Sequence, residues 1–513
     1  MSFFKMKRSF FILFILFVGI AVACSETTID VNEIHYIGNV QTSLTQLIDS
    51  RSQVYDVGIS KNSIIVTLKD STIRIDTESF PFLSVNTNEC WTINNKELTN
   101  VRVYIEDGQI SFPDLLIHDG NLYVNGIISN FSWKPKTSDA IAASDEWIFA
   151  AAKANDYICF YRSNGVKVIL PIIDNANFVV PDYFFDSLVT KERLSEEIAK
   201  GLPSEQQHRY IFFTDAHWGR NQKHSPALIK HIVDYSGINQ VLFGGDANTS
   251  FTDTPQGTLD IGFQFHQAFS FLGPKLFCVF GNHDDNSTGQ ATSFERHLTE
   301  DQVYAFLQSQ MTNVHYWDYY NFYYDDLNSK TRFLCMDTGR FYEASLRGKL
   351  TKTAKFAIES LMEVPNGWHI VAASHIWCNL RNYDTGETAE SVYIRPIIEV
   401  LENYNLRKKG SFTYNGETLE YDFSNVGAVV EYCIGGHTHG DAVVPSRKGL
   451  PLIIVTCDAQ QEVAGGAPYD TGTVNEQCVT IVLNDYQNKE VNILHVGRGE
   501  DLKTKMWESA TII

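Results

Sequence analysis

The second half of the chain repeats one arrangement, in which a short apolar strand is followed by a polar cluster and then by a helical stretch. Strands that alternate with helices in this way are typical of an α/β layered sheet. A helix is predicted first, over Asp186–Lys200. The strands predicted after it are Tyr210–Thr214, Gln240–Phe243, Lys275–Phe280, Arg332–Met336, His369–Ala373, Glu431–Ile434 and Leu452–Val455.

The polar clusters after these strands contain glycine together with side chains that bind metals. Ligands of α/β sheets bind at the carboxyl ends of the strands, so we expect the clusters to converge in space. Glycine allows a strand to turn sharply while the next side chain points at the site. The clusters are Asp215-Ala216-His217, Gly245-Asp246, Gly281-Asn282-His283-Asp284, His375 and Gly436-His437-Thr438-His439.

These residue types suit a centre that holds two cations. An Asp carboxylate can bridge two ions, neutral imidazole binds Zn, Mn or Fe, and an Asn carbonyl adds a ligand without charge. Two cations about 3.5–4 Å apart can clamp an ester phosphate and lower the pKa of a bound water. Any one cluster alone would be read as an ordinary turn, but five in succession indicate a site.

In order and spacing, the set resembles the calcineurin-like metallophosphoesterase superfamily over roughly residues 205–500. The resemblance implies a two-sheet α/β sandwich with a dimetal site at the strand ends. It also implies that metal-activated water hydrolyses a phosphomonoester or a phosphodiester. One metal would be held by Asp215, His217 and His439, the other by Asn282, His375 and His437, and Asp246 would bridge both.

The same resemblance assigns the residues that act on the substrate. His283 matches the histidine that positions the phosphate and protonates the leaving oxygen, and Asp284 matches the acidic residue that orients it. Purple acid phosphatases place a Tyr ligand three residues after the bridging Asp, where this chain has Thr249. A charge-transfer iron site is therefore not expected, and the two ions are divalent or mixed-valence Mn, Fe or Zn.

Substrate contacts are less clearly marked in the sequence. Arg220 and Arg340 are candidates because a guanidinium forks well onto phosphate oxygens. Trp218 and Trp377 adjoin predicted ligands and either wall the pocket or pack in the core. The long polar stretch Asn379–Tyr432 is either a lid that sets specificity or a surface insertion. The substrate class is thus left open.

The region before Val179 is predicted to be mostly β and carries no cluster of metal-ligand type. It is interpreted as an accessory domain, a spacer or a binding module. The expected division is a signal peptide at 1–23, a β-rich domain at 24–185 and the catalytic domain at 186–513. Predicted elements are hairpins at 63–76 and Tyr157–Pro171, strands near Val101–Ile105 and Leu122–Ile128, and a short helix over Asn39–Arg51.

The N-terminus has the plan of a secretory signal. A basic patch at Lys5–Arg8 precedes an apolar run, Phe10–Ala23, that is short for a membrane span. The run ends in Ala-Val-Ala before Cys24, which resembles the lipobox of bacterial lipoproteins. This resemblance implies cleavage before Cys24 and a lipid on its thiol, whereas the alternative is an ordinary signal peptide with a chance cysteine.

Two C-terminal segments, Gly472–Gln477 and Val496–Gly499, resemble parts of Bacteroidetes-type metallophosphoesterase lipoproteins. Together with the lipobox, this implies a protein anchored in the cell envelope. Retention in the inner membrane typically uses Asp after the lipidated cysteine. This chain has Ser25 there, so the outer membrane is expected.

The formal net charge of -20 argues against binding to a nucleic-acid backbone, because phosphates favour clustered Lys and Arg. A small phosphorylated substrate remains compatible, since bound cations reverse the local field. The other eight cysteines form no CxxC pair, so buried free thiols are predicted. The oligomeric state is left open.

Two other functions compete with hydrolysis. One is a non-catalytic ligand- or glycan-binding surface lipoprotein on a hydrolase-derived fold, and the other is an adhesin role for the β region. Decay of an enzyme usually removes ligands, and here all seven candidate ligands and His283 are present. Hydrolysis is therefore the favoured interpretation.

Overall fold

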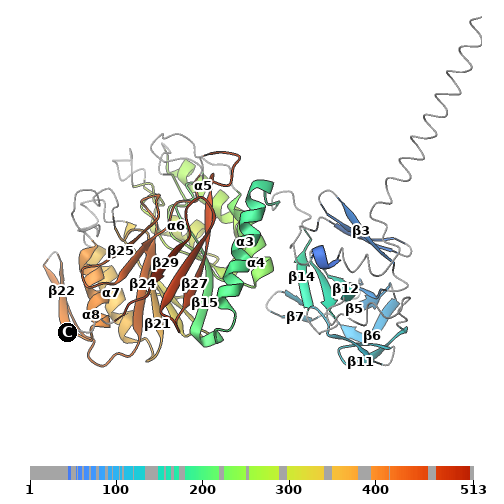
Figure 1. The fold of residues 1–513 in the computed structure, drawn as a ribbon. Coiled ribbons are helices and arrows are strands. Elements are labelled where there is room, and N and C mark those ends of the chain that lie inside the picture. The colour runs from blue at the N-terminus through green and yellow to red at the C-terminus, as the bar shows by residue number, and fades with distance from the viewer. Residues whose placement is uncertain are drawn as a thin grey trace, which may run out of the picture. The chain divides into compact units, whose positions relative to one another are not determined.

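The described chain forms two compact units, Met1–Val179 (unit 1) and Val180–Ile513 (unit 2), which are drawn in Figure 1. The predicted signal peptide and Cys24 lie outside the described residues. The computed structural model describes residues 44–47, 54, 56–60, 63–68, 71–76, 80–86, 90–94, 96–102, 104–106, 109–118, 121–132, 148–154, 157–162, 167–172, 179–218, 224–249, 254–287, 297–339, 349–378, 394–414, 416–459 and 470–508.

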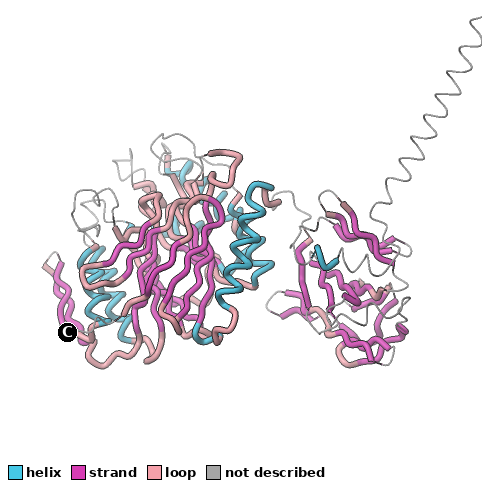
Figure 2. The backbone as a smooth tube through the Cα atoms, viewed as in Figure 1, coloured by secondary structure: helices cyan, strands magenta, loops and turns pink. Residues whose placement is uncertain are grey.

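The described part of unit 1 is built almost entirely of strands, as Figure 2 shows by colour. Of the helix predicted over Asn39–Arg51, residues 44–47 are described and are helical. The strands are β1 (Asp56–Ser60), β2 (Ser63–Thr67), β3 (Thr72–Asp76), β4 (Phe82–Val85), β5 (Cys90–Ile93), β6 (Lys96–Arg102), β7 (Tyr104–Glu106), β8 (Gln109–Ser111), β9 (Leu115–His118), β10 (Asn121–Val124), β11 (Ile127–Ser132), β12 (Ile148–Ala154), β13 (Tyr157–Arg162) and β14 (Lys167–Pro171).

The largest sheet of unit 1 has the order β14-β13-β12-β4-β5-β6. Strands β12 and β4 pair in parallel, whereas the other neighbours are antiparallel. Both predicted hairpins are confirmed, as the antiparallel pairs β2–β3 and β13–β14. Trp91, Leu83 and Cys159 lie in the buried core of this unit. The N-terminal region is therefore β-rich.

Unit 2 contains all seven strands predicted for it, with ends shifted by at most three residues. Its helices are α3 (Asp182–Ala199), η3 (Ser204–Gln206), α4 (Ser225–Ser236), α5 (Pro255–Ala268), η4 (Ser270–Lys275), α6 (Glu300–Leu307), α7 (Lys349–Met362) and α8 (Arg395–Asn405). Its strands are β15 (Gln207–Phe213), β16 (Val241–Phe243), β17 (Leu276–Cys278), β18 (His315–Tyr316), β19 (Phe322–Asp326), β20 (Thr331–Cys335), β21 (His369–Ala373), β22 (Lys409–Tyr414), β23 (Glu417–Asp422), β24 (Val429–Gly435), β25 (Ala442–Pro445), β26 (Pro451–Ile454), β27 (Cys478–Asp485), β28 (Glu490–Gly497) and β29 (Leu502–Lys505).

Helix α3 begins earlier than predicted, at Asp182 directly after Pro181. Its buried side includes Phe184 and Leu188, which belong to the core of unit 2. The expected domain boundary after residue 185 falls inside this helix. The helix belongs as a whole to unit 2, because the division between the units lies at Val179 and Val180.

Two sheets form the centre of unit 2. One has the order β17-β16-β15-β27-β28-β29, and the other has the order β18-β19-β20-β21-β24-β26-β25. Helices α3 and α4 contact the first sheet, and α8 contacts the second sheet beside α7, as Figure 1 shows. The result is a sandwich of two sheets with helices on its outer faces.

A chain of buried hydroxyl and amide groups joins the two sheets. The Tyr210 hydroxyl on β15 lies 2.9 Å from the Tyr432 hydroxyl on β24. Tyr432 in turn donates to Oδ1 of Asn484 on β27 at 2.7 Å. Buried polar groups must find partners, so these bonds favour one alignment of the two sheets.

The carboxyl ends of the parallel strands point to one edge of the sandwich. In the first sheet β15, β16 and β17 are mutually parallel. In the second sheet β20, β21, β24 and β26 are parallel. The segments that follow these strands carry the predicted polar clusters.

No helix within the described part of the chain is long and apolar enough to cross a bilayer.

Candidate metal centre

Six of the predicted ligands come together in two groups of three. In each group the candidate ligand atoms all lie within 4.8 Å of one another. The strands before these residues belong to both sheets: β15 and β16 to the first, and β21 and β24 to the second. The groups are Asp215, His217 and His439, and Asp246, His375 and His437.

Asp215 is fully buried, and its two carboxylate oxygens have different surroundings. Oδ2 accepts hydrogen bonds from the Thr214 hydroxyl at 2.8 Å and from the backbone N–H of His437 at 2.9 Å. Oδ1 faces three imidazoles, with Nε2 of His439 at 3.3 Å, of His375 at 3.8 Å and of His217 at 3.9 Å. None of these is a well-aligned hydrogen bond, so the arrangement leaves Oδ1 available to a cation.

Asp246, a member of the second group, lies between His375 and His283. Its Oδ2 is 3.1 Å from Nε2 of His375 and 3.9 Å from Nε2 of His283. Its Oδ1 accepts from the backbone N–H of His283 at 2.8 Å. The carboxylate therefore faces both a candidate ligand and the candidate proton donor.

Backbone carbonyls fix which ring nitrogen of two histidines faces the centre. Nδ1 of His217 lies 3.0 Å from the Asn248 carbonyl oxygen, and Nδ1 of His375 lies 2.8 Å from that of Gly244. A carbonyl only accepts, so each Nδ1 carries the proton and donates. Each Nε2 then faces the centre as the candidate metal ligand, and Nε2 of His217 lies 3.1 Å from Nε2 of His439.

The electrostatics of the cluster favour positive charge. Burial lowers the pKa of His375, but the Asp246 and Asp215 carboxylates outweigh burial and raise it to about 9. Burial likewise lowers the pKa of His439, and the neighbouring Asp215 carboxylate outweighs burial and raises it to about 11. The pKa of His217 falls to about 3, mainly through burial. Burial likewise lowers the pKa of His437 to about 4, so two of the four grouped histidines favour the neutral form that binds a metal ion.

Five of the six grouped residues have an unusual backbone. Twelve non-glycine residues in the described ranges have positive φ, a conformation that L side chains rarely adopt. Strained residues of this kind gather at functional sites, where the surrounding structure enforces them. The five are Asp215 (φ 52°), His217 (43°), Asp246 (61°), His437 (73°) and His439 (58°).

Two glycines are required by close approach rather than by flexibility. A Cβ at Gly281 would lie 2.1 Å from both the backbone N and Oδ1 of Asp246. A Cβ at Gly436 would lie 2.2 Å from Oδ2 of Asp215 and from the Thr214 hydroxyl. The predicted role of glycine at the strand ends is thus borne out in steric terms.

Asp284, which is predicted to orient His283, has a carboxylate that hydrogen-bonds the backbone. Its carboxylate accepts from the backbone N–H groups of Gly281 at 2.8 Å, Asn248 at 3.1 Å and Asp246 at 3.2 Å. The His283 ring is instead oriented by the Thr249 carbonyl, 3.0 Å from its Nδ1. Burial and the nearby Asp246 charge raise the pKa of Asp284 to about 7. Asp284 therefore holds the ligand loops together.

The sequence carried no signal for the carbonyl partners, because every residue has a carbonyl group. The hydroxyl of Thr214 could have been noticed, since it directly precedes Asp215 at the end of a strand. Asn282 is 3% exposed and lies between Gly281 and His283 in the same loop. Its role as a metal ligand stays a prediction.

The candidate substrate contacts Arg220 and Arg340 lie outside the described residues. Trp377 is fully buried and donates to the Ile434 carbonyl at 2.8 Å, so it is a core residue. Trp218 packs edge-on against Phe265 and Phe269. Of the predicted lid or insertion, residues 394–414 and 416–432 are described, and they contain α8, the β22–β23 hairpin and the start of β24.

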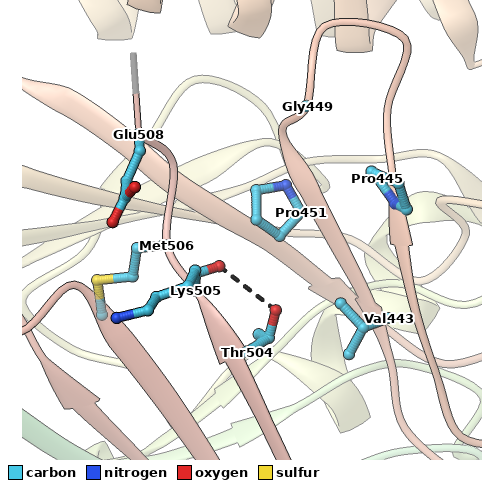
Figure 3. Close-up of a pocket in the computed structure, with 8 residues that line it drawn as sticks. All are labelled: Val443, Pro445, Gly449, Pro451, Thr504, Lys505, Met506 and Glu508. Atoms are coloured by element: carbon cyan, nitrogen blue, oxygen red, sulfur yellow. Dashed lines mark hydrogen bonds between the residues drawn. The ribbon is translucent and has the colours of Figure 1, made fainter. Parts of the chain in front are cut away.

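A surface pocket of about 300 Å³ lies away from these ligands, between the edge strands β25 and β29. Figure 3 shows its lining, which contains no candidate metal ligand. The lining residues are Val443, Pro445, Gly449, Pro451, Thr504, Lys505, Met506 and Glu508. The metal centre is therefore a separate site.

Carboxylates and imidazoles gathered at the strand ends are donor types that suit a pair of metal ions. Residues 208–441 match the family described as calcineurin-like phosphoesterase. The chain accordingly contains a calcineurin-like metallophosphoesterase domain, with both groups of metal ligands in place.

Comparison with solved structures gives low similarity. A dimetal phosphatase from Danio rerio has a TM-score of 0.37 and 10% identity, covering 58% of this chain and 99% of that one. Vps29 from Chaetomium thermophilum has a TM-score of 0.17 and 12% identity, covering 59% and 98%. With scores this low, neither structure bears on the function. Comparison with curated proteins finds no match.

Replacement of Gly281 by alanine should lower the number of metal ions that the centre binds. The new methyl group would collide with Asp246 at 2.1 Å, and a backbone shift there would displace the carboxylate. We expect Gly281→Ala to bind fewer metal ions per chain than the native protein, measured by elemental analysis. Gly58→Ala is the control, because a Cβ there meets nothing within 4 Å. Native metal content in Gly281→Ala would contradict this account.

Proposed function

We propose that this chain hydrolyses a phosphate monoester or diester at a centre formed by Asp215, His217 and His439 with Asp246, His375 and His437, and completed by Asn282. The observation that carries the proposal is the buried Oδ1 of Asp215, which faces imidazoles of both groups at 3.3–3.9 Å. A carboxylate oxygen in that position fits a cation held with these imidazoles, and Asp246 is the proposed bridge to the second ion.

The donor set fits Mn, Fe or Zn, since it combines carboxylate oxygen with imidazole nitrogen. When bound, two such ions supply Lewis acidity to a phosphate oxygen and acidify a water molecule. The residues of the chain hold the ligand atoms in place before substrate arrives. The carbonyls of Asn248 and Gly244 set the ring orientations, and Thr214 fixes one oxygen of Asp215.

His283 is placed to handle a proton at the edge of this centre. Its Nδ1 donates to the Thr249 carbonyl, which leaves Nε2 as the reactive nitrogen. Nε2 lies 3.9 Å from Oδ2 of Asp246, and the side chain is 14% exposed. From there it can donate a proton to the leaving oxygen of an ester.

The alternative of a non-catalytic binding protein gains no support from the centre. A decayed site would have lost ligands or relaxed its strained backbone. Here both three-residue groups are assembled, and five of their members retain positive φ. Maintaining that geometry has a purpose only if ions are bound.

The proposal is tested with a panel of phosphate mono- and diesters, supplied with Mn, Zn or Fe separately. We expect hydrolysis by the native chain and none by Asp246→Asn, which should also bind fewer than two ions. A neutral amide cannot balance two dications as a carboxylate does. Two bound ions and unchanged turnover in the variant would refute the assignment of Asp246.

His283→Ala should lower turnover about 10²–10⁴-fold while leaving metal content nearly native, since general acid catalysis contributes about that much. Esters with poor leaving groups should be affected most, because they depend on protonation. The measurement is kcat across leaving groups of widely different pKa. Equal losses for all of them would exclude a proton-donor role.

We also propose that the chain is exported and anchored by lipid at Cys24, in the outer membrane of a cell envelope. Support comes from the basic patch, the apolar run and the Ala-Val-Ala-Cys ending, together with Ser25. The catalytic motifs begin at Asp215, far beyond the anchor. Attachment and chemistry should therefore be separable.

Cys24→Ala should yield an active enzyme that no longer partitions with membranes. Each buried methylene of a lipid contributes about 0.8 kcal/mol, and stable attachment takes two or more chains. Detergent phase partitioning of both forms, followed by the same ester assay, checks both halves of this expectation. A variant that still fractionates with membranes would place the anchor elsewhere.

A further inference from the structure

The turn that follows β28 carries an arginine whose polar contacts lie almost entirely on backbone. Nη1 of Arg498 donates to the carbonyls of Glu476 at 3.2 Å and Asn475 at 3.3 Å. Nη2 donates to the Ala459 carbonyl at 3.1 Å, to Sγ of Cys457 at 3.1 Å and to the Cys457 carbonyl. One guanidinium thus joins two segments that are distant in sequence.

The glycines on either side of Arg498 are required by this arrangement. Gly497 has φ of 113°, and a Cβ there would lie 2.1 Å from the Gln477 carbonyl oxygen. Gly499 has φ of 103°, and a Cβ there would lie 2.6 Å from Oδ2 of Asp441. The Gly-Arg-Gly turn is therefore shaped to lie against both neighbouring segments.

One of the two segments holds the loop that carries the ligand His439. The Thr456 hydroxyl donates to the His439 carbonyl at 3.1 Å, and the Thr456 backbone N–H donates to Oδ1 of Asp441 at 2.8 Å. His495, on β28, lies 2.9 Å from the same oxygen of Asp441. The ligand loop is thus held by residues that come later in the chain, Thr456 and His495.

An arginine is suited to this task where a lysine is not. The guanidinium presents five donors in a rigid plane and can satisfy several carbonyls at once. A lysine ammonium has three donors on a flexible stem and cannot reach both segments with the same geometry. Contacts of this kind behind metal ligands typically change metal affinity by about 10–100-fold.

We propose that Arg498 is a positioning residue for the metal ligand His439, acting by locking the segment Thr456–Ala459 against the ligand loop. The inference rests on the metal centre of the proposed function. It extends the support of that centre to residues beyond 441, where the match to the family ends. Arg498 acts on the ion held by Asp215, His217 and His439.

The test compares Arg498→Lys with Arg407→Lys. Arg407 is a matched control because it also bridges backbone carbonyls, those of Tyr404 at 2.9 Å and Ala428 at 2.7 Å. It lies before β24, whereas the ligand loop follows that strand. Binding of Co²⁺ to the metal-free proteins is measured by calorimetry and by visible absorption, and thermal unfolding is recorded for each.

We expect Arg498→Lys to bind one of two Co²⁺ ions about 10–100-fold more weakly, with altered visible absorption from that ion. Arg407→Lys should bind both ions as the native protein does. Raising the Co²⁺ concentration should restore both ions in Arg498→Lys, which a misfolded protein would not show. Thr456→Val, which removes one link to the His439 loop, should weaken the same ion.

Native affinity for both ions in Arg498→Lys would overturn the proposal, and so would an equal loss in Arg407→Lys. Both results are independent of ester hydrolysis. A native chain that binds two ions but hydrolyses no ester would reject the proposed function and leave this inference standing. An active enzyme whose metal affinity does not depend on Arg498 would reject this inference and leave the proposed function standing.

Discussion

Two carboxylates, Asp215 and Asp246, are buried among imidazoles, and the local structure is organised around that fact. Removal of an ion from water costs on the order of several kcal/mol unless opposite charge compensates it. The neighbouring imidazoles offer such compensation, since the two carboxylates raise the pKa of His375 and Asp215 raises that of His439. Metal ions would supply the same compensation, so their binding should contribute directly to the stability of unit 2.

The strands and the residue types of the centre could be predicted because the sequence carries two independent signals for them. Each apolar run ends in a cluster with glycine, and the side chains in the clusters are ligand types. The partners of those side chains could not be predicted, since carbonyls such as those of Thr249 and Asn248 carry no signature. The backbone partners of the Asp284 carboxylate could not be predicted for the same reason. Arg498 depends on contacts between segments that only the folded chain brings together.

The pairing of strands in unit 1 illustrates the same limit. Local hairpins such as β2–β3 follow from a turn between two β-branched runs, and they were predicted. The parallel contact between β12 and β4 joins residues about seventy positions apart and has no local signal. In unit 2 the alignment of the two sheets is likewise set by buried groups, Tyr210, Tyr432 and Asn484, that no periodicity reveals. Asp215, His217 and Asp246 follow strands of the first sheet, and the other three ligands follow strands of the second. The alignment of the sheets therefore also sets the distances between these two sets of ligands.

The pairing of β15 with β27 has a consequence for the order in which the protein is made. Gln207 pairs with Asp485 and Phe212 with Thr480. Strand β15, which precedes the first metal ligands, therefore cannot pair with β27 until residues 478–485 have been synthesised. A ribosome that has delivered every predicted ligand, up to His439, has not yet delivered that partner strand. Pairings over such distances form slowly, because a long loop must close first. The sheet that carries the first metal ligands can therefore be completed only after residue 485 has been made, and the ions must be acquired from the surroundings in which that later part of the chain folds.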